Sequence, residues 1–95
     1  MHGRHGYAFH RSIAAELWAK RVLAEPNRAA EERISLLYQT AFARSPREEE
    51  TADALQFLAT QAREYGLPAE VQTDPRPWTD LAHVLMNVKE FIFLD

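Results

Sequence analysis

Hydrophobic side chains recur along the chain at the three- and four-residue spacing of amphipathic helices. The clearest run occupies the final eighteen residues, where a wide apolar stripe requires a hydrophobic surface to cover it. That stripe consists of Leu81, Val84, Leu85, Val88, Phe91 and Ile92. With three earlier segments of similar spacing, the pattern predicts helices over residues 8–24, 28–43, 46–65 and 79–93.

Residues with strong local preferences define the first boundaries. Pro26 ends the first segment because proline lacks an amide donor and restricts the residue before it. Asn27 is the expected N-cap of the second helix. Ser45, Pro46 and Glu48 match a capping box, with serine as N-cap, proline at the first helical position and glutamate three residues after the serine.

The later boundaries follow from glycine and proline. Gly66 is expected to close the third helix, because glycine readily adopts the left-handed conformation of a helix end. Residues 67–77 contain three prolines and no sustained period, which indicates a loop. Thr79 is the expected N-cap of the fourth helix, with Asp80 in its first turn near the positive end of the helix dipole.

The predicted fold is all-α, a small orthogonal or bundle-like array of about four helices. Residues 1–7 are predicted to form a flexible N-terminal segment, and residues 8–95 a single helical domain with a limited core. The second and third helices are expected to form a hairpin that the fourth helix closes. The predicted core comprises Leu17, Ile34, Leu37, Phe42, Leu55, Leu58, Leu81, Leu85, Val88 and Ile92.

Composition narrows the range of functions. The chain has 11 basic and 14 acidic side chains, and its net charge of −3 favours neither nucleic acid nor an anionic membrane. The lack of cysteine excludes disulfides, thiolate catalysis, thiolate-bound zinc and covalent haem attachment through Cys-x-x-Cys-His. No run approaches the roughly 18 apolar residues that read as a membrane-spanning helix. We find no signal-peptide pattern either, and the compartment stays unassigned.

Histidines give no convincing catalytic or metal site. His2, His5 and His10 could together bind a metal ion. The glycines among them, however, indicate an N-terminal segment that does not hold the three side chains in fixed positions. His83 lies in the fourth predicted helix, where a lone histidine more often forms a hydrogen bond at a core edge. We therefore expect no catalytic, cofactor-binding or metal-binding residues, and no enzyme activity in this chain.

Two groups of polar residues have structural explanations. Glu48, Glu49, Glu50 and Asp53 form an acidic cluster at the start of the third helix, which complements the helix dipole and argues against DNA binding through that helix. Asn87 and Glu90 flank the apolar stripe of the last helix. Either they face solvent, or Glu90 forms an ion pair with Arg44 or Arg33 that fixes how that helix packs.

Several short motifs in the chain occur together in one known family. They are Arg33-Ile34, Arg44-Ser-Pro46 with Glu50 four residues after the proline, Trp78-x-Asp80-Leu-Ala, and Asn87-x-x-Glu90-Phe91. With these motifs, residues 15–95 resemble the C-terminal segment of planctomycete-type proteins that carry a cytochrome c domain, known as the domain of unknown function 1553 family.

The resemblance implies structural or interaction roles for the motif residues, and it carries over no catalytic residues. It also implies a longer, exported parent protein with haem-binding cysteine motifs upstream. Because this chain has no cysteine, neither haem nor electron transfer is carried over. The same motif residues, Arg33, Arg44, Pro46, Glu50, Trp78, Asp80, Asn87, Glu90 and Phe91, are the candidate interaction residues.

These observations lead to a functional hypothesis. The chain is expected to be a noncatalytic helical packing or protein-interaction domain, as the C-terminal module or a fragment of a larger protein. Its partner is expected to be another protein, the remainder of a parent chain or a second copy, without nucleic acid or cofactor. The alternative is an accessory or regulatory part of an enzyme or redox protein whose active site lies in upstream domains or a partner chain.

Overall fold

The fold is all-α, as the sequence predicts. The computed structural model describes residues 13–26, 28–68 and 73–94, with side chains described as far as Val88. This part of the chain contains no strand. Its four helices are α2 (Ile13–Leu23), α3 (Ala30–Phe42), α4 (Glu48–Glu64) and α5 (Pro75–Leu94). The start predicted for the first helix, at residue 8, lies outside the described residues.

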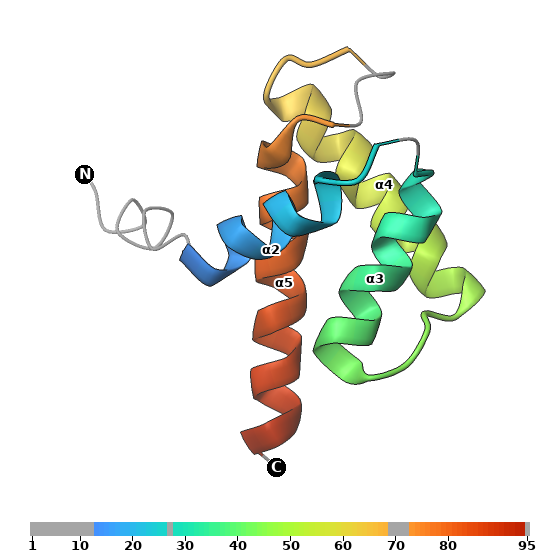
Figure 1. Cartoon of the computed structure of the whole chain (residues 1–95), viewed down its shortest axis with the longest axis vertical. Helices are drawn as coiled ribbons and strands as arrows, with labels where there is room; N and C mark the ends of the chain where they lie inside the picture. The colour runs from blue at the N-terminus through green and yellow to red at the C-terminus, as the bar shows by residue number, and fades with distance from the viewer. Residues whose placement is uncertain (1–12, 27, 69–72, 95) are drawn as a thin grey trace.

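Helix α5 is the element around which the other three are arranged (Figure 1). The helices α3 and α4 run in opposite senses, so the predicted hairpin is present and α5 packs against both of its helices. The most extensive packing of α5 is nevertheless against α2, which crosses it. Within the described residues α2 and α4 make no close contact, and α3 and α5, which each contact both, connect the two sides of the fold.

The start of α3 differs from the prediction. Asn27 itself lies outside the described residues, but the helix begins at Ala30 with Ala29 as its N-cap. Alanine has no side-chain oxygen that could accept a hydrogen bond from the first turn of the helix. Instead, a side chain of the first turn accepts a hydrogen bond from the N-cap backbone. The backbone N–H of Ala29 donates to Glu32 Oε1 at 3.0 Å, which fixes the first turn from inside the helix.

The predicted capping box at the start of α4 is wrong by two residues. Arg47, rather than Ser45, is the N-cap, and its backbone N–H donates to Glu50 Oε1 at 2.8 Å. Glu50 takes the position expected for Glu48 because it also binds Arg44, on the other side of the turn. The predicted end is confirmed: α4 ends at Glu64, and Gly66 has a positive φ of 72°.

The start of α5 is also corrected, because the helix begins at Pro75 and not at Thr79. Asp74 Oδ1 accepts a hydrogen bond from the backbone N–H of Arg76 at 3.0 Å, as an N-cap carboxylate does. Proline suits the first helical position, where its missing N–H would have no helical partner. Thr79 is buried within the helix and does not cap it.

Most of the predicted core is confirmed. Its buried members are Ile34, Leu37, Leu58, Leu81 and Leu85, with Phe42 and Leu55 partly buried against them. Trp78 and Tyr38 are also buried, and Trp78 is among the largest fully buried side chains.

Two predicted core residues are wrong. The side chains of Leu17 and Val88 are 58% and 43% exposed, and that of Ile92 lies outside the described set. On α2 the buried face consists of Ala15, Ala19 and Val22 instead of the face that carries Leu17. Small side chains on the buried face allow α2 to approach its neighbours closely, so the larger leucine on the opposite face remains in solvent.

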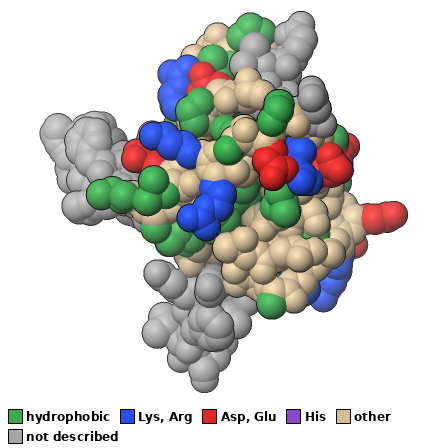
Figure 2. Space-filling model, in the orientation of Figure 1, with side chains coloured by type: hydrophobic (Ala, Val, Ile, Leu, Met, Phe, Trp, Pro, Cys, Tyr) green, Lys and Arg blue, Asp and Glu red, His purple; other side chains and the backbone are tan. Residues whose placement is uncertain are grey.

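The outer surface is mixed on the face drawn in Figure 2, where hydrophobic side chains lie among acidic and basic ones. No helix in the described part of the chain has the combination of length and apolarity required to cross a bilayer.

Candidate functional site

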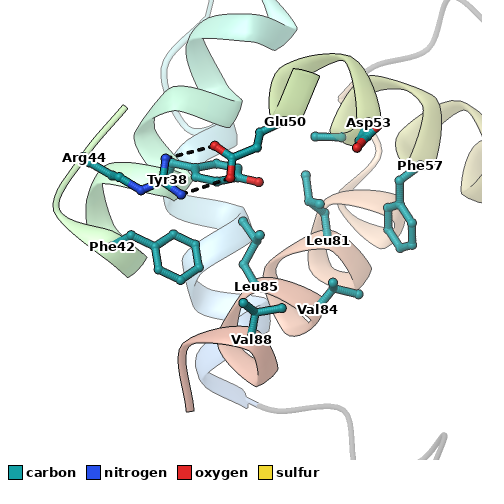
Figure 3. Close-up of a pocket in the computed structure, with 11 residues that line it drawn as sticks. Tyr38, Phe42, Arg44, Glu50, Asp53, Phe57, Leu81, Val84, Leu85 and Val88 are labelled. Carbon is teal, nitrogen blue, oxygen red and sulfur yellow. Dashed lines mark hydrogen bonds and ion pairs between the residues drawn. The ribbon is translucent and has the colours of Figure 1, made fainter. Parts of the chain in front are cut away.

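An apolar groove of about 410 Å³ lies where α3, α4 and α5 meet (Figure 3). All three helices and the turn between α3 and α4 contribute side chains to it. The lining residues are Tyr38, Phe42, Arg44, Glu50, Asp53, Ala54, Phe57, Leu81, Val84, Leu85 and Val88.

One side of the groove is a face of α5. Leu81 and Leu85 are buried in the core, whereas Val84 and Val88 are 42% and 43% exposed. These four residues fall on one face of the helix and extend over about 10 Å at 1.5 Å per residue. Val84 and Val88 therefore present apolar surface at the opening of the groove, one helical turn apart.

A bidentate ion pair between Arg44 and Glu50 stabilises the turn between α3 and α4. Arg44 Nη1 donates to Glu50 Oε1 at 2.9 Å, and Arg44 Nη2 donates to Glu50 Oε2 at 3.0 Å. Arg44 Nη1 also donates to the carbonyl oxygen of Ser45 at 3.0 Å. Such paired contacts give a guanidinium a defined orientation, and this one fixes the edge of the groove (Figure 3).

Two aromatic rings lie beneath the same guanidinium. The Arg44 carbon Cζ is 5.6 Å from the ring centroid of Tyr38 and 5.7 Å from that of Phe42. The two rings contact each other, with centroids 5.4 Å apart and planes tilted by 50°. Arg44 therefore joins the polar edge of the groove to its apolar wall through cation–π contacts.

The ion pair alters the titration of the groove's polar groups. The hydrogen bond from Arg44, followed by that from the Arg47 backbone, lowers the pKa of Glu50 from 4.5 to about 2. The hydrogen bond to Glu50 raises the pKa of Arg44. Burial, and then the charge of Glu50, raise the pKa of the Tyr38 hydroxyl. At neutral pH the groove therefore contains a charged arginine–glutamate pair beside a neutral tyrosine.

Asp53 gives the groove an excess of negative charge. It is exposed on the groove wall, one turn beyond Glu50, and makes no ion pair within the described residues. Glu49 is four residues earlier and exposed, so it lies on the same face of α4 as Asp53. Because Arg44 pairs with Glu50, no side chain in the described part of the chain supplies a cation to this acidic edge of α4.

A second polar cluster joins α5 to the end of α4. Asp80 Oδ2 accepts a hydrogen bond from Gln61 Nε2 at 2.8 Å and one from the Tyr65 hydroxyl at 2.6 Å. The Arg76 guanidinium lies 4.9 Å from the Tyr65 ring centroid and is paired with Asp74. These contacts tie the helices together away from the groove.

The remaining candidate residues are dispersed. Arg33 is buried, and its Nη2 donates to the carbonyl oxygen of Glu25 at 2.8 Å, while its Nε has no partner among the described residues. Pro46 is half-buried in the turn before α4, and Asn87 is exposed on α5. Trp78 belongs to the core. The side chains of Glu90 and Phe91 lie outside the described residues. The two arginines considered as ion-pair partners of Glu90 bind other groups: Arg44 pairs with Glu50, and Arg33 donates to the Glu25 carbonyl oxygen.

The sequence does not predict the groove. Of the candidate residues whose side chains are described, only Arg44 and Glu50 line it, and the sequence pattern places Val84 and Val88 in the apolar stripe of a closing helix. One available signal was the breadth of that stripe, since adjacent pairs such as Val84 and Leu85 point in directions that one neighbouring helix does not cover.

The chemistry of the groove suits binding of apolar side chains. In the described part of the chain no three His, Cys, Asp or Glu side chains form a group able to hold a metal ion. His83, on α5, is half-buried, while His2, His5 and His10 are outside the described residues.

No known family model, curated protein or solved structure matches the chain.

Proposed function

We propose that this domain is a noncatalytic protein-interaction module whose binding surface is the groove between α3, α4 and α5. The observation that carries the proposal is the exposure of Val84 and Val88 on the wall of an apolar groove. Apolar surface gathered in a concave site is characteristic of binding sites, whereas single exposed hydrophobic side chains are common on any protein.

The groove's construction supports this role. The Arg44–Glu50 pair holds one edge, and the core residues Leu81 and Leu85 hold the opposite wall. A preformed surface loses little conformational entropy when a partner binds, so more of the apolar burial contributes to affinity. The resemblance to the C-terminal segment of longer proteins agrees with a domain that packs against other protein surface, and it too remains a proposal.

Selection of displayed peptides tests the role of the groove. We expect a random peptide library to yield apolar peptides that bind the immobilised 95-residue chain. Their binding should be lost in the Val84→Asp/Val88→Asp double variant, because each aspartate places a charge in the apolar wall.

Asn87→Asp is the control for an added aspartate, since it places one such charge on α5 at an exposed residue that does not line the groove. It should retain peptide binding. Far-UV circular dichroism and urea unfolding must show that all three chains are folded. Selected peptides that bind the double variant as well as the parent chain would refute the groove as the interaction surface.

A further inference from the structure

We infer that the occupant of the groove is helix α2 of a second copy of this chain, so that copies associate head to tail. The inference rests on the proposed function, because it assigns a partner to the same groove. Its starting point is that the chain carries a second, separate apolar surface on α2, with charge of the opposite sign.

The exposed face of α2 is itself amphipathic. Ile13 and Leu17 are 73% and 58% exposed and lie four residues apart, on one face of the helix. Lys20 and Arg21 are exposed in the following turn, on either side of the line through Ile13 and Leu17. Over α2, Figure 2 shows hydrophobic side chains beside those of Lys and Arg.

Among the described residues of its own copy, this face makes no core contact. The core contacts of α2 are made by Ala15, Ala19 and Val22, on the opposite side of the helix. Because no residue of α2 lines the groove, its exposed face and the groove are different surfaces of one molecule. Both are therefore available at once for two different neighbours.

The two surfaces match in spacing and length. Ile13 and Leu17 are separated by one turn, as are Val84 and Val88 in the groove. Rows of side chains four residues apart are the ridges that most often interdigitate when two helices pack. The stretch from Ile13 to Lys20 covers about 10 Å, the same length as Leu81 to Val88 at 1.5 Å per residue.

The surfaces also match in charge. Asp53 and Glu49 form an acidic edge with no cation in the described structure, while Lys20 and Arg21 are exposed and form no ion pair there. With the apolar side chains in the groove, the basic end of α2 carries charge opposite to that of the acidic edge of α4. Opposite charge across an interface selects the partner and its orientation more than it adds affinity.

A heterologous contact of this kind has a diagnostic property. Each copy offers one α2 face and one groove, so the contact repeats into a ring or an open chain. A twofold dimer would instead bring the same patch of both copies together. Copies with a defective α2 face and copies with a defective groove should therefore complement one another.

Light scattering after size-exclusion chromatography tests this property. For the parent chain we expect the mean mass to exceed 10.9 kDa and to rise with protein concentration. Leu17→Asp, which damages only the α2 face, and Val88→Asp, which damages only the groove, should each be monomeric. A 1:1 mixture of the two variants should form a dimer that does not grow further, because one intact pair of surfaces remains.

Charge exchange provides a second measurement. Asp53→Lys with Glu49→Lys should abolish association, and adding Lys20→Glu and Arg21→Glu in the same chain should restore it. Asn87→Asp is the control and should associate like the parent chain, and circular dichroism must show that every variant is folded.

A parent chain that is monomeric at every concentration, or variants that dimerise alone, would overturn the inference. If the selected peptides still bound through Val84 and Val88, the proposed groove function would stand without self-association. If no peptide depended on those valines, the proposed function itself would fail.

Discussion

Arg44 is the residue in which most of the described polar contacts of the groove converge. It forms two hydrogen bonds to Glu50, a third to the Ser45 carbonyl, and cation–π contacts with Tyr38 and Phe42. The preceding residue, Ala43, has a positive φ of 58°, and its backbone N–H donates to the carbonyl oxygen of Gln39 in the last turn of α3. The sharp turn between the helices therefore depends on side-chain bonds rather than on a glycine.

Glu50→Gln should reduce the loss of stability in acid. The pKa of Glu50 lies below its ordinary value, so its contribution is complete above about pH 4.5 and is lost as the pH falls towards about 2. The variant lacks this titration, and its free energy of unfolding should be lower at neutral pH and change less over that interval. Urea unfolding at a series of pH values measures both effects.

Glu49→Gln is the control for that experiment, because Glu49 is exposed and forms no ion pair in the described structure. It should show the acid dependence of the parent chain. An equally steep acid dependence in Glu50→Gln would show that the Arg44 pair does not contribute to stability.

At the level of single residues, the sequence predicts burial well where a helix has one apolar face. Ile34 and Leu37 on α3 are such residues, and both are fully buried. It fails at Leu17 because α2 buries its alanines, and hydrophobicity alone ranks leucine above alanine. The Arg44–Glu50 pair was not predicted either, since it depends on the conformation of the turn between them.

At the level of elements, the start of α5 is predicted too late because prolines in its first turn resemble loop residues in the sequence. Pro75 and Pro77 read as loop residues in the sequence, yet both lie in the first turn of α5, where a backbone N–H has no helical acceptor. Asp74 directly before Pro75 was the informative residue, because aspartate is a preferred N-cap. The prolines therefore begin the helix.

Asp74→Ala should destabilise the domain by about 1 kcal/mol, the usual cost of removing an N-cap side chain. The variant loses the acceptor for the Arg76 backbone N–H at the start of α5. Chemical denaturation followed by tryptophan fluorescence is a suitable measurement, since Trp78 lies in the same first turns.

Asp74→Asn separates the cap from the ion pair with Arg76, because asparagine caps a helix as well as aspartate but carries no charge. It should retain most of the stability that Asp74→Ala loses. Equal destabilisation by both substitutions would assign the effect to the ion pair instead of the cap.

At the level of the whole molecule, close packing of α2 depends on its small side chains. Ala15 and Ala19 are completely buried and lie one turn apart on the face directed to the core. A larger side chain at either residue requires α2 to move away from the helices that it contacts, chiefly α5.

Ala19→Leu should therefore lower the free energy of unfolding by about 1–3 kcal/mol, the usual cost of overpacking a filled core. Ala14→Leu introduces the same side chain on the exposed side of the same helix, and it should change stability by less than about 0.5 kcal/mol. Urea unfolding of both variants provides the comparison. A stable Ala19→Leu chain would mean that α2 is not closely packed.

The fold class could be predicted at this scale, but the groove could not. Four helical periods and short connections are sufficient to indicate an all-α array. The groove requires the relative placement of α3, α4 and α5, which no single helical pattern contains. Tyr38 and Phe57 line the same groove from different helices, and nothing in their local sequence associates them.

The packing of α2 against α5 determines when the fold can be completed. During synthesis α2 leaves the ribosome first, and α3 and α4 both follow before the helix that covers its alanine face has been made. Pairing of segments this far apart in sequence slows folding, because the intervening chain must first be closed into a loop. We therefore expect nascent chains that end before Pro75 to expose the apolar faces of their helices, and so to be substrates for chaperones and proteases.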